Sequence, residues 1–470
     1  MGMDRRYEIR LYDETLIEFS LSKDSFGSLT ATVISVAEDR WMVMPLPLVE
    51  AVTPQAVLDW IEGRVVPRNR AFVDKLLSQV GLAQGDTMGL IDICLGLSLN
   101  DSYWIVPEGF SGRFADYNLY DNEFDEALAL TAYTGYTTGQ RHEAGLSSEW
   151  TTSGQFPKAW RRVDGAPVLY KAGTEGFANA GMEPYSEFLA AQVADAFGMP
   201  HVAYGLEMWH GRLASTCDLA NSREVSLVTF WPATKTSLFP QTLLAASAIS
   251  DEALSFLRSL LVFDSLIANP DRHANNYGFL RDNATGRIVG PAPVYDNNLS
   301  LFARDLPSDF PTWLERGGEM IPAGAKIPFN DVAALVMQES DHEGLRRLVG
   351  FSFENHPDYP IDPARLDALS AFVRGRARTM LGMRPVKSAD LIQLAKTSVG
   401  SEVIPTPPAA LLATDESISR MDASLFSEAR QNDSIDSLRA LNHNATQARD
   451  YRESLRRHND CPANEDLHIG

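Results

Sequence analysis

The chain has 470 residues, of which 44% are hydrophobic and 22% charged, so most of it can bury a core and collagen-like or wholly disordered classes are excluded. Its 41 Lys and Arg against 62 Asp and Glu give a net charge of −21, which argues against a surface that binds nucleic acid throughout. Three distant cysteines show no metal or disulfide spacing, no apolar run approaches ~18 residues, and the charged start lacks a signal-peptide core. We therefore expect a cytoplasmic protein with no membrane attachment and no direct DNA binding.

The N-terminal region, residues 1–145, predicts a mixed α/β domain. The segment YEIRLYDETLIEF alternates apolar and polar residues as a pair of strands does. Thr53 followed by Pro54 is typical of a helix start, and AFVDKLLSQVGL has helical spacing that ends at Gly81. We find no catalytic constellation in this part of the sequence.

Residues 146–235 predict an open sheet with one inserted helix. PVLYKAG is typical of a strand, PYSEFLAAQVADAFGM of a helix, and VAYGLEMWHGRLAS and VSLVTFW of further strands. Residues 236–385 predict a mostly helical region. Residues 386–470 begin with a proline-rich linker, and we expect the polar tail that follows to be disordered.

The most informative stretch is NPDRHANNYGFLRDNATGRIVGPAPVYDNN, residues 269–298. It predicts a hairpin that brings Asp271, Asn276 and Asp296 to one end. Two carboxylates and a carboxamide are hard oxygen ligands, which suit Mg²⁺. Protein kinases use the D-x-x-x-x-N spacing for a catalytic aspartate and a metal-binding asparagine. A loop rich in turn-forming residues is the ordinary alternative.

Two upstream features fit the same chemistry. Lys171 ends a predicted strand and Glu187 lies 16 positions later on a predicted helix, and kinases use such a pair to aim an ammonium group at the ATP phosphates. Before them, TTSGQFPKAW places Gly154 among hydroxyl residues, where backbone N–H groups can approach phosphate. Each feature is weak alone, because surface lysines, glutamates and turn glycines are common. Their order along the chain favours a kinase.

With these motifs the chain resembles the HipA-like serine/threonine kinases, the toxin kinases of bacterial HipBA-type modules. The resemblance covers roughly residues 150–385 and is clearest in NPDRHANN, VYDNN, VLYKAG and FENHPDYPIDPARLDALSAF. It implies an α+β, protein-kinase-like bilobal fold, with a small β-rich lobe and a helical C-lobe. It also implies ATP and Mg²⁺ as cofactors, Asp271 as the base, Asn276 and Asp296 as metal ligands, and Lys171 as a phosphate contact.

The resemblance implies partners and regulation as well. Relatives modify translation factors, so we expect a protein substrate, with a translation component as one candidate, and a helix-turn-helix antitoxin as a candidate partner. Relatives can autophosphorylate a hydroxyl just before the loop glycine. Thr151, Thr152 and Ser153 are therefore candidate acceptors, and ordinary turn hydroxyls are the alternative.

Two questions stay open from the sequence alone. Val228 and Phe230 lie where the strand between the lobes should run, and they can either pack on adenine or serve as ordinary strand residues. The leading hypothesis is an ATP- and Mg-dependent serine/threonine protein kinase. The alternatives are a lipid or small-molecule kinase, which the net charge of −21 disfavours at anionic membranes, and a nucleotide-binding pseudokinase that acts through a partner.

Overall fold

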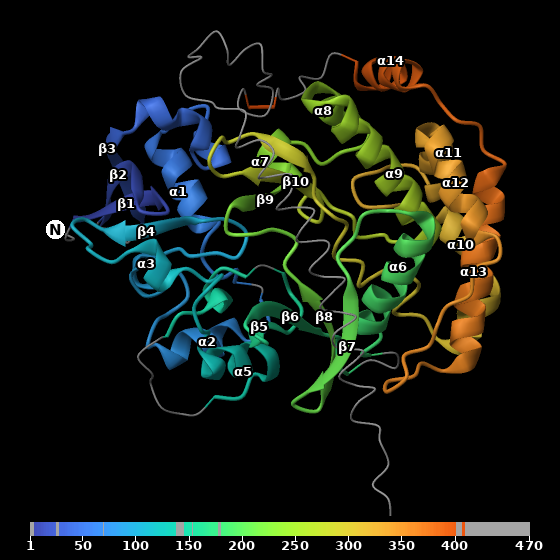
Figure 1. The fold of residues 1–470 in the computed structure, drawn as a ribbon, viewed down its shortest axis with the longest axis horizontal. Helices are drawn as coiled ribbons and strands as arrows, with labels where there is room; N and C mark the ends of the chain where they lie inside the picture. Colours follow the sequence, from blue (N-terminus) through green and yellow to red (C-terminus); the bar gives the residue numbers. More distant parts are fainter. Residues whose placement is uncertain are drawn as a thin grey trace, which may run out of the picture. The chain divides into compact units, whose positions relative to one another are not determined.

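The computed structural model describes residues 4–24, 28–68, 70–137, 145–152, 154–176, 180–400 and 407–408 (Figure 1). These residues belong to one compact unit. Ser153 and the predicted tail from residue 409 onward lie outside the described residues. Within the described ranges, no helix combines the length and the apolar character that a bilayer crossing requires.

The N-terminal region is built on an antiparallel sheet in the order β3-β2-β1-β4. Its strands are β1 (Arg5–Leu11), β2 (Glu14–Lys23), β3 (Leu29–Val36) and β4 (Tyr103–Pro107). Its α-helices are α1 (Pro54–Glu62), α2 (Val73–Gln79), α3 (Thr87–Cys94), α4 (Phe114–Tyr117) and α5 (Glu126–Thr134), and its 3₁₀ helices are η1 (Glu38–Val43), η2 (Leu46–Leu48) and η3 (Ser148–Trp150). Thr53 caps α1 as predicted, because its Oγ1 accepts a hydrogen bond from the Ala56 N–H at 3.1 Å.

A second antiparallel sheet follows in the order β5-β6-β8-β7. Its strands are β5 (Lys158–Val163), β6 (Ala166–Ala172), β7 (Tyr204–Trp209) and β8 (Arg212–Asp218). Helix α6 (Glu183–Phe197) is inserted between β6 and β7, buries Leu189 and Val193, and ends at Gly198, which has a φ of 86°. This region has the predicted form of a sheet with one inserted helix.

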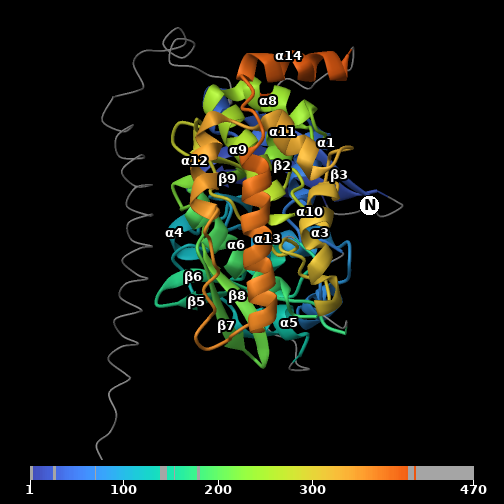
Figure 2. The same cartoon turned by 90° about the vertical axis from the view of Figure 1, so that its right-hand side faces the viewer.

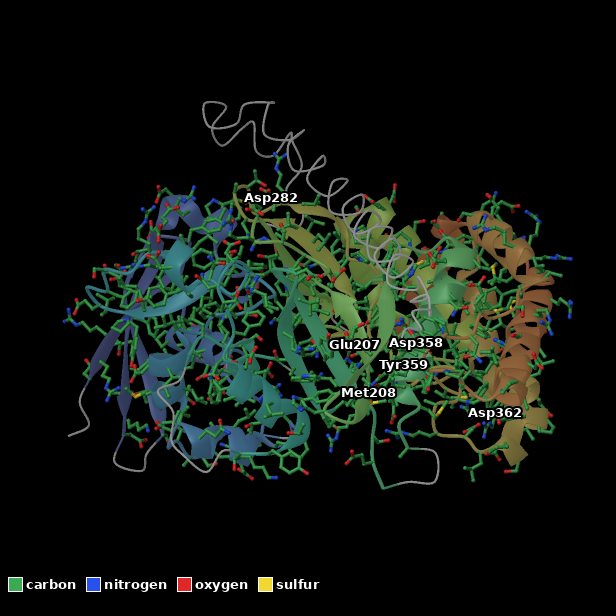
Figure 3. The ribbon with its side chains drawn as sticks, turned by 60° about the horizontal axis from the view of Figure 1, so that its bottom comes forward. Glu207, Met208, Asp282, Asp358, Tyr359 and Asp362 are labelled. Carbon is green, nitrogen blue, oxygen red and sulfur yellow. The ribbon has the colours of Figure 1, made fainter. Side chains whose placement is uncertain are left out.

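Strand β9 (Val225–Thr229) does not join this sheet. It pairs with β10 (Gly278–Asp282), which also pairs with β11 (Ile288–Pro291), so a third sheet has the order β11-β10-β9. The predicted strand VSLVTFW ends at Thr229, because the backbone N–H of Phe230 turns to donate to Tyr277 O at 2.8 Å and begins helix α7 (Phe230–Thr234). Asp282, labelled in Figure 3, caps the turn of the β10–β11 hairpin through bonds from Thr285.

The remaining region is helical, as predicted. It contains α8 (Gln241–Ile249), α9 (Asp251–Ile267), η4 (Pro307–Thr312), α10 (Trp313–Glu319), α11 (Phe329–Val336), α12 (Glu339–Leu348) and α13 (Pro363–Leu381). Helix α9 lies at the centre and contacts α6, α8, α11 and α13, and Figure 2 shows α13 running between α12 and α10. The α+β fold class predicted from the sequence is therefore correct.

The linker expected from residue 386 overlaps a helix in the structure. Residues Ser388–Val399 form helix α14, which packs on α8 and buries Leu391 and Ala395. The buried Arg258 on α9 donates to Val386 O and to Ser388 Oγ, which ties the start of α14 to the helical region. The polar composition hid this helix, because only one narrow apolar stripe is buried.

Candidate active site

The D-x-x-x-x-N loop lies between α9 and β10 and is fixed by its own side chains. Asn269 Nδ2 donates to Asp264 Oδ1 at 3.3 Å, and its Oδ1 accepts from the Asp271 N–H at 3.2 Å. Asn276 Nδ2 donates to the Asp271 carbonyl at 3.1 Å. This bond closes the loop across the two motif residues and turns the other amide atom of Asn276, Oδ1, away from that contact.

Arg272 braces this loop from inside the protein. Its guanidinium forms a buried ion pair with Asp264, with Nε at 3.1 Å from Oδ2 and Nη2 at 3.1 Å from Oδ1. Its Nη1 donates to Asn276 O at 3.0 Å and to Tyr295 O at 2.5 Å, and Nη2 contacts Asn297 Oδ1. One side chain thus holds α9, the catalytic-loop candidate and the segment before and after Asp296 together.

Three charged residues that are distant in sequence meet beside this loop. Lys171 Nζ, at the end of β6, lies 3.1 Å from Glu187 Oε1 on α6 and also contacts Asp296 Oδ1. The other oxygen of Glu187, Oε2, accepts from the Asn297 N–H at 2.7 Å. Asp296 itself has a φ of 57°, an uncommon backbone for a non-glycine residue, and its N–H donates to Tyr204 Oη at 3.1 Å.

The charges at this site perturb one another. Burial by itself would raise the pKa of Asp296, but Lys171 and Lys158 outweigh burial and lower it, so the carboxylate is held ionised. Burial and the neighbouring Lys171 lower the pKa of Lys158 to about 7. Burial raises the pKa of Asp271; His273 opposes that change and Asp296 adds to it, which puts the two carboxylates within electrostatic range. A raised carboxyl pKa suits a group that accepts a proton near neutral pH.

A cavity of about 170 Å³ opens onto Lys158, Lys171 and Asp296, whereas Asp271 and Asn276 are not among the described residues that line it. Its polar lining includes Thr151, Thr152, Lys158, Lys171, Glu187, Tyr204, Tyr295 and Asp296. Its apolar lining includes Trp160, Leu169, Val202, Leu219, Ala220 and Leu227. Lys158 and Lys171 are direct partners on β5 and β6, so both ammonium groups lie on the same face of the sheet. An apolar wall with paired cations at one end fits a nucleotide, with its base on the first and its phosphates on the second.

For Val228 and Phe230 the sequence leaves open whether they pack on adenine or serve as ordinary strand residues. Neither is among the described residues that line the cavity. Val228 packs against the core of the helical region, and Phe230 is buried with its ring 4.9 Å from that of Tyr277. Leu227 lines the cavity instead, because neighbouring residues of β9 face opposite sides of the strand.

The glycine loop is only partly described. Gly154 has a φ of 93°, a backbone conformation that L side chains rarely adopt, and a Cβ there would meet the Lys158 ammonium group. Thr151 Oγ1 donates to Leu97 O and Thr152 Oγ1 to Ser148 O, both at 2.8 Å. Both threonine hydroxyls are therefore engaged, although both residues line the cavity.

The side chains present fit a magnesium ion that is shared with phosphate. No group of three His, Cys, Asp or Glu side chains that could hold a metal occurs among the residues that the structure describes. Asp296 and Asn276 would offer two oxygen ligands, and Mg²⁺ commonly completes its shell with water and substrate phosphates. The predicted ligand pair is thus chemically suited to a metal that arrives with a nucleotide.

Sequence reasoning missed several supporting residues. Tyr204 and Asn297 contact Asp296 and Glu187 across segments that are distant in sequence. Asp264 holds Arg272, which lies eight residues further along the chain. Lys158, by contrast, has a local sequence signal, because it follows the glycine loop and starts a strand.

No family model and no curated protein matches the chain. Two kinases of known structure are similar to it. One is the Helicobacter pylori proinflammatory kinase CtkA, at 16% identity and a TM-score of 0.42, over 52% of this chain and 94% of that chain. The other is HipA of the Shewanella oneidensis MR-1 toxin–antitoxin system, solved with HipB and its operator DNA, at 14% identity and a TM-score of 0.49, over 82% of this chain and 99% of that chain.

Proposed function

We propose that the protein is an ATP- and Mg²⁺-dependent serine/threonine protein kinase of the HipA type. The observation that carries this proposal is the contact of Lys171 with both Glu187 and Asp296, beside the loop of Asp271 and Asn276. A lysine held by a helix glutamate, next to a metal-binding aspartate, is the arrangement with which kinases receive ATP phosphates.

Nucleotide binding follows from the two ends of the cavity. The base takes the apolar part near Leu169, Val202 and Leu227, and the phosphates take the end with Lys158 and Lys171. Asp296 and Asn276 would hold Mg²⁺, which neutralises phosphate charge when it is bound. Glu187 keeps Lys171 directed toward the phosphates, since one of its oxygens is anchored on the Asn297 N–H.

In this proposal Asp271 acts on the acceptor. The hydroxyl oxygen of a serine or threonine attacks the γ-phosphorus, and the bond from that phosphorus to the bridging oxygen of ADP breaks. The hydroxyl proton passes to the Asp271 carboxylate, whose pKa is raised by burial. Arg272 does not touch the phosphates in this scheme, because its donors are directed at Asp264, Asn297 and backbone carbonyls.

The biological role is proposed from the motifs alone. A translation component as substrate, a helix-turn-helix antitoxin as partner, and autophosphorylation near the glycine loop all follow the resemblance to HipA-like kinases. Modification of Thr151 or Thr152 would first have to break its bond to a backbone carbonyl. Phosphate there would add about −1.5 to −2 charges beside the nucleotide phosphates and should weaken ATP binding.

The test is transfer of labelled phosphate from ATP with Mg²⁺ to a protein mixture. Wild type should transfer phosphate to serine or threonine, and Asp271→Asn should not. Asp367→Asn, an exposed aspartate on α13, is the matched control and should act like wild type. Labelling of lipid or small molecules only would favour the alternative kinase class, and ATP binding without transfer by wild type would favour a pseudokinase.

A further inference from the structure

A loop of the N-terminal region reaches the nucleotide cavity. It follows α3, where Leu95 and Gly96 both have positive φ and turn the chain, and it leads into β4. We refer to residues 97–100 as the crossing loop. Ser98, Leu99 and Asn100 line the same cavity as Lys171 and Asp296.

One end of the crossing loop holds the segment that connects the second and third sheets. This connecting segment, residues 219–224, joins β8 to β9, and Leu219, Ala220 and Asn221 line the cavity. Asn221 Nδ2 donates to Leu99 O at 2.9 Å and to Tyr120 Oη at 3.1 Å. Tyr120 Oη also donates to Leu99 O at 3.1 Å, which closes a small buried network.

Further bonds extend this contact along the connection. The Leu227 N–H on β9 donates to Asn100 O at 2.7 Å. The Arg223 carbonyl accepts from Tyr12 Oη at 2.9 Å and from Ser102 Oγ at 2.5 Å, both in the N-terminal region. The backbone on which a nucleotide base would lie is thus held by the N-terminal region.

The other end of the crossing loop holds the start of the glycine loop. Thr151 Oγ1 donates to Leu97 O at 2.8 Å, and Thr151 lines the cavity three residues before Gly154. Four consecutive residues, 97–100, therefore span from the glycine loop to the connecting segment. Both of these segments line the cavity proposed for the nucleotide. The crossing loop therefore forms a third wall of that cavity, beside the glycine loop and the connecting segment.

We propose that the crossing loop positions the nucleotide and selects its base, so that the N-terminal region is part of the ATP site. This inference rests on the proposed kinase function. The ligand class is a purine nucleoside triphosphate, with Ser98 and Asn100 as polar residues of the wall and Leu99 as its apolar residue. Asn221 is a positioning residue, because its buried amide fixes the connecting segment to the loop.

The test measures binding of AMP-PNP and GMP-PNP to the full chain by calorimetry in Mg²⁺. Asn221→Ala and Ser98→Ala are compared with Gln79→Ala, which removes a buried amide within the N-terminal region that is bonded to Thr131 and does not line the cavity. We expect Asn221→Ala to raise the Kd for AMP-PNP about tenfold, as the loss of one or two buried hydrogen bonds predicts. The preference for AMP-PNP over GMP-PNP should also fall, and KM for ATP should rise by a larger factor than kcat falls.

The outcomes separate this inference from the kinase assignment. If wild type binds neither nucleotide, the proposed function itself fails. If wild type binds AMP-PNP and both variants keep the affinity and base preference of Gln79→Ala, the kinase assignment stands and the role of the crossing loop is overturned. Ser98→Ala decides the matter if Asn221→Ala does not fold, because Ser98 is only half-buried.

Discussion

Asp264 neutralises a guanidinium that is buried behind the catalytic-loop candidate, so Asp264→Asn should damage both stability and turnover. Asp264 and Arg272 are almost fully buried, with side chains 1% and 2% exposed. Asparagine keeps the shape of the side chain but removes its charge, and one of its two amide atoms is a donor that would face Arg272.

The size of the expected loss of stability follows from the contacts that Arg272 would keep in the Asp264→Asn variant. Arg272 would keep only neutral partners in direct contact, the carbonyls of Asn276, Tyr295 and Asp296 and the Asn297 amide. Leaving a buried charge without its partner costs about 3–5 kcal/mol. The same guanidinium donates hydrogen bonds to Asn276 O and to Tyr295 O, just before Asp296. Because catalysis here depends on the position of these residues, we also expect kcat to fall at least about tenfold.

The assay is urea unfolding followed by tryptophan fluorescence, with phosphoryl transfer measured in parallel. Asp341→Asn is the control, since Asp341 is also buried but accepts hydrogen bonds from the neutral Ser259 Oγ and Gln338 N–H. The Asp341→Asn variant should lose about 1–3 kcal/mol of its free energy of unfolding and keep the kcat of wild type. Equal losses of stability and turnover in the two variants would refute the reasoning that Arg272 needs Asp264 as its counter-ion.

Three other changes test the site. Asp296→Asn should weaken Mg²⁺-dependent binding of AMP-PNP, measured by calorimetry, whereas Asp271→Asn should spare binding and abolish transfer; the reverse pattern would exchange their roles. Because the pKa of Lys158 is about 7, its charge is lost as pH rises from 6 to 8.5, so ADP affinity should fall over that range in wild type and fall less in Lys158→Met; parallel pH profiles would contradict this. A chain ending at residue 400 should fold and turn over ATP, whereas one ending at residue 386 should unfold at lower temperature, because α14 is removed; equal thermal melts would show that α14 adds no stability.

The predictable part of the fold carried local signals. Thr53, Ser250 and Asp362 cap α1, α9 and α13, and each hydroxyl or carboxylate accepts from a backbone N–H of its own helix. The error at VSLVTFW had a tertiary origin. Its residues are ordinary strand formers, and only pairing with β10 places Val225–Thr229 in the third sheet and turns Phe230 into α7.

The same contrast applies to the site. The spacing of Asp271 and Asn276 carries a chemical meaning that needs no structure, and the order of Lys171 and Glu187 supports it. The residues that hold the neighbouring Arg272 and Asp296 carry no such signal in the sequence. Asp264 and Tyr204 are each unremarkable residues until the structure shows their contacts. Side-chain alternation along β9 also cannot be assigned until the strand's register is known, so the sequence alone does not show that Leu227, and not Val228, lines the cavity.

The N-terminal region shows the limit of motif reading most clearly. It reaches the cavity through the carbonyls of Leu97, Leu99 and Asn100, and a backbone carbonyl leaves no signature in the residue type. The buried Arg281 on β10 adds a further tie through Met44 O at 2.9 Å. A kinase fragment cut at residue 146 would therefore lack one wall of the cavity and several bonds that hold its connecting segment. Loss of activity in such a fragment would not argue against the kinase assignment, whereas full activity would argue against the third wall.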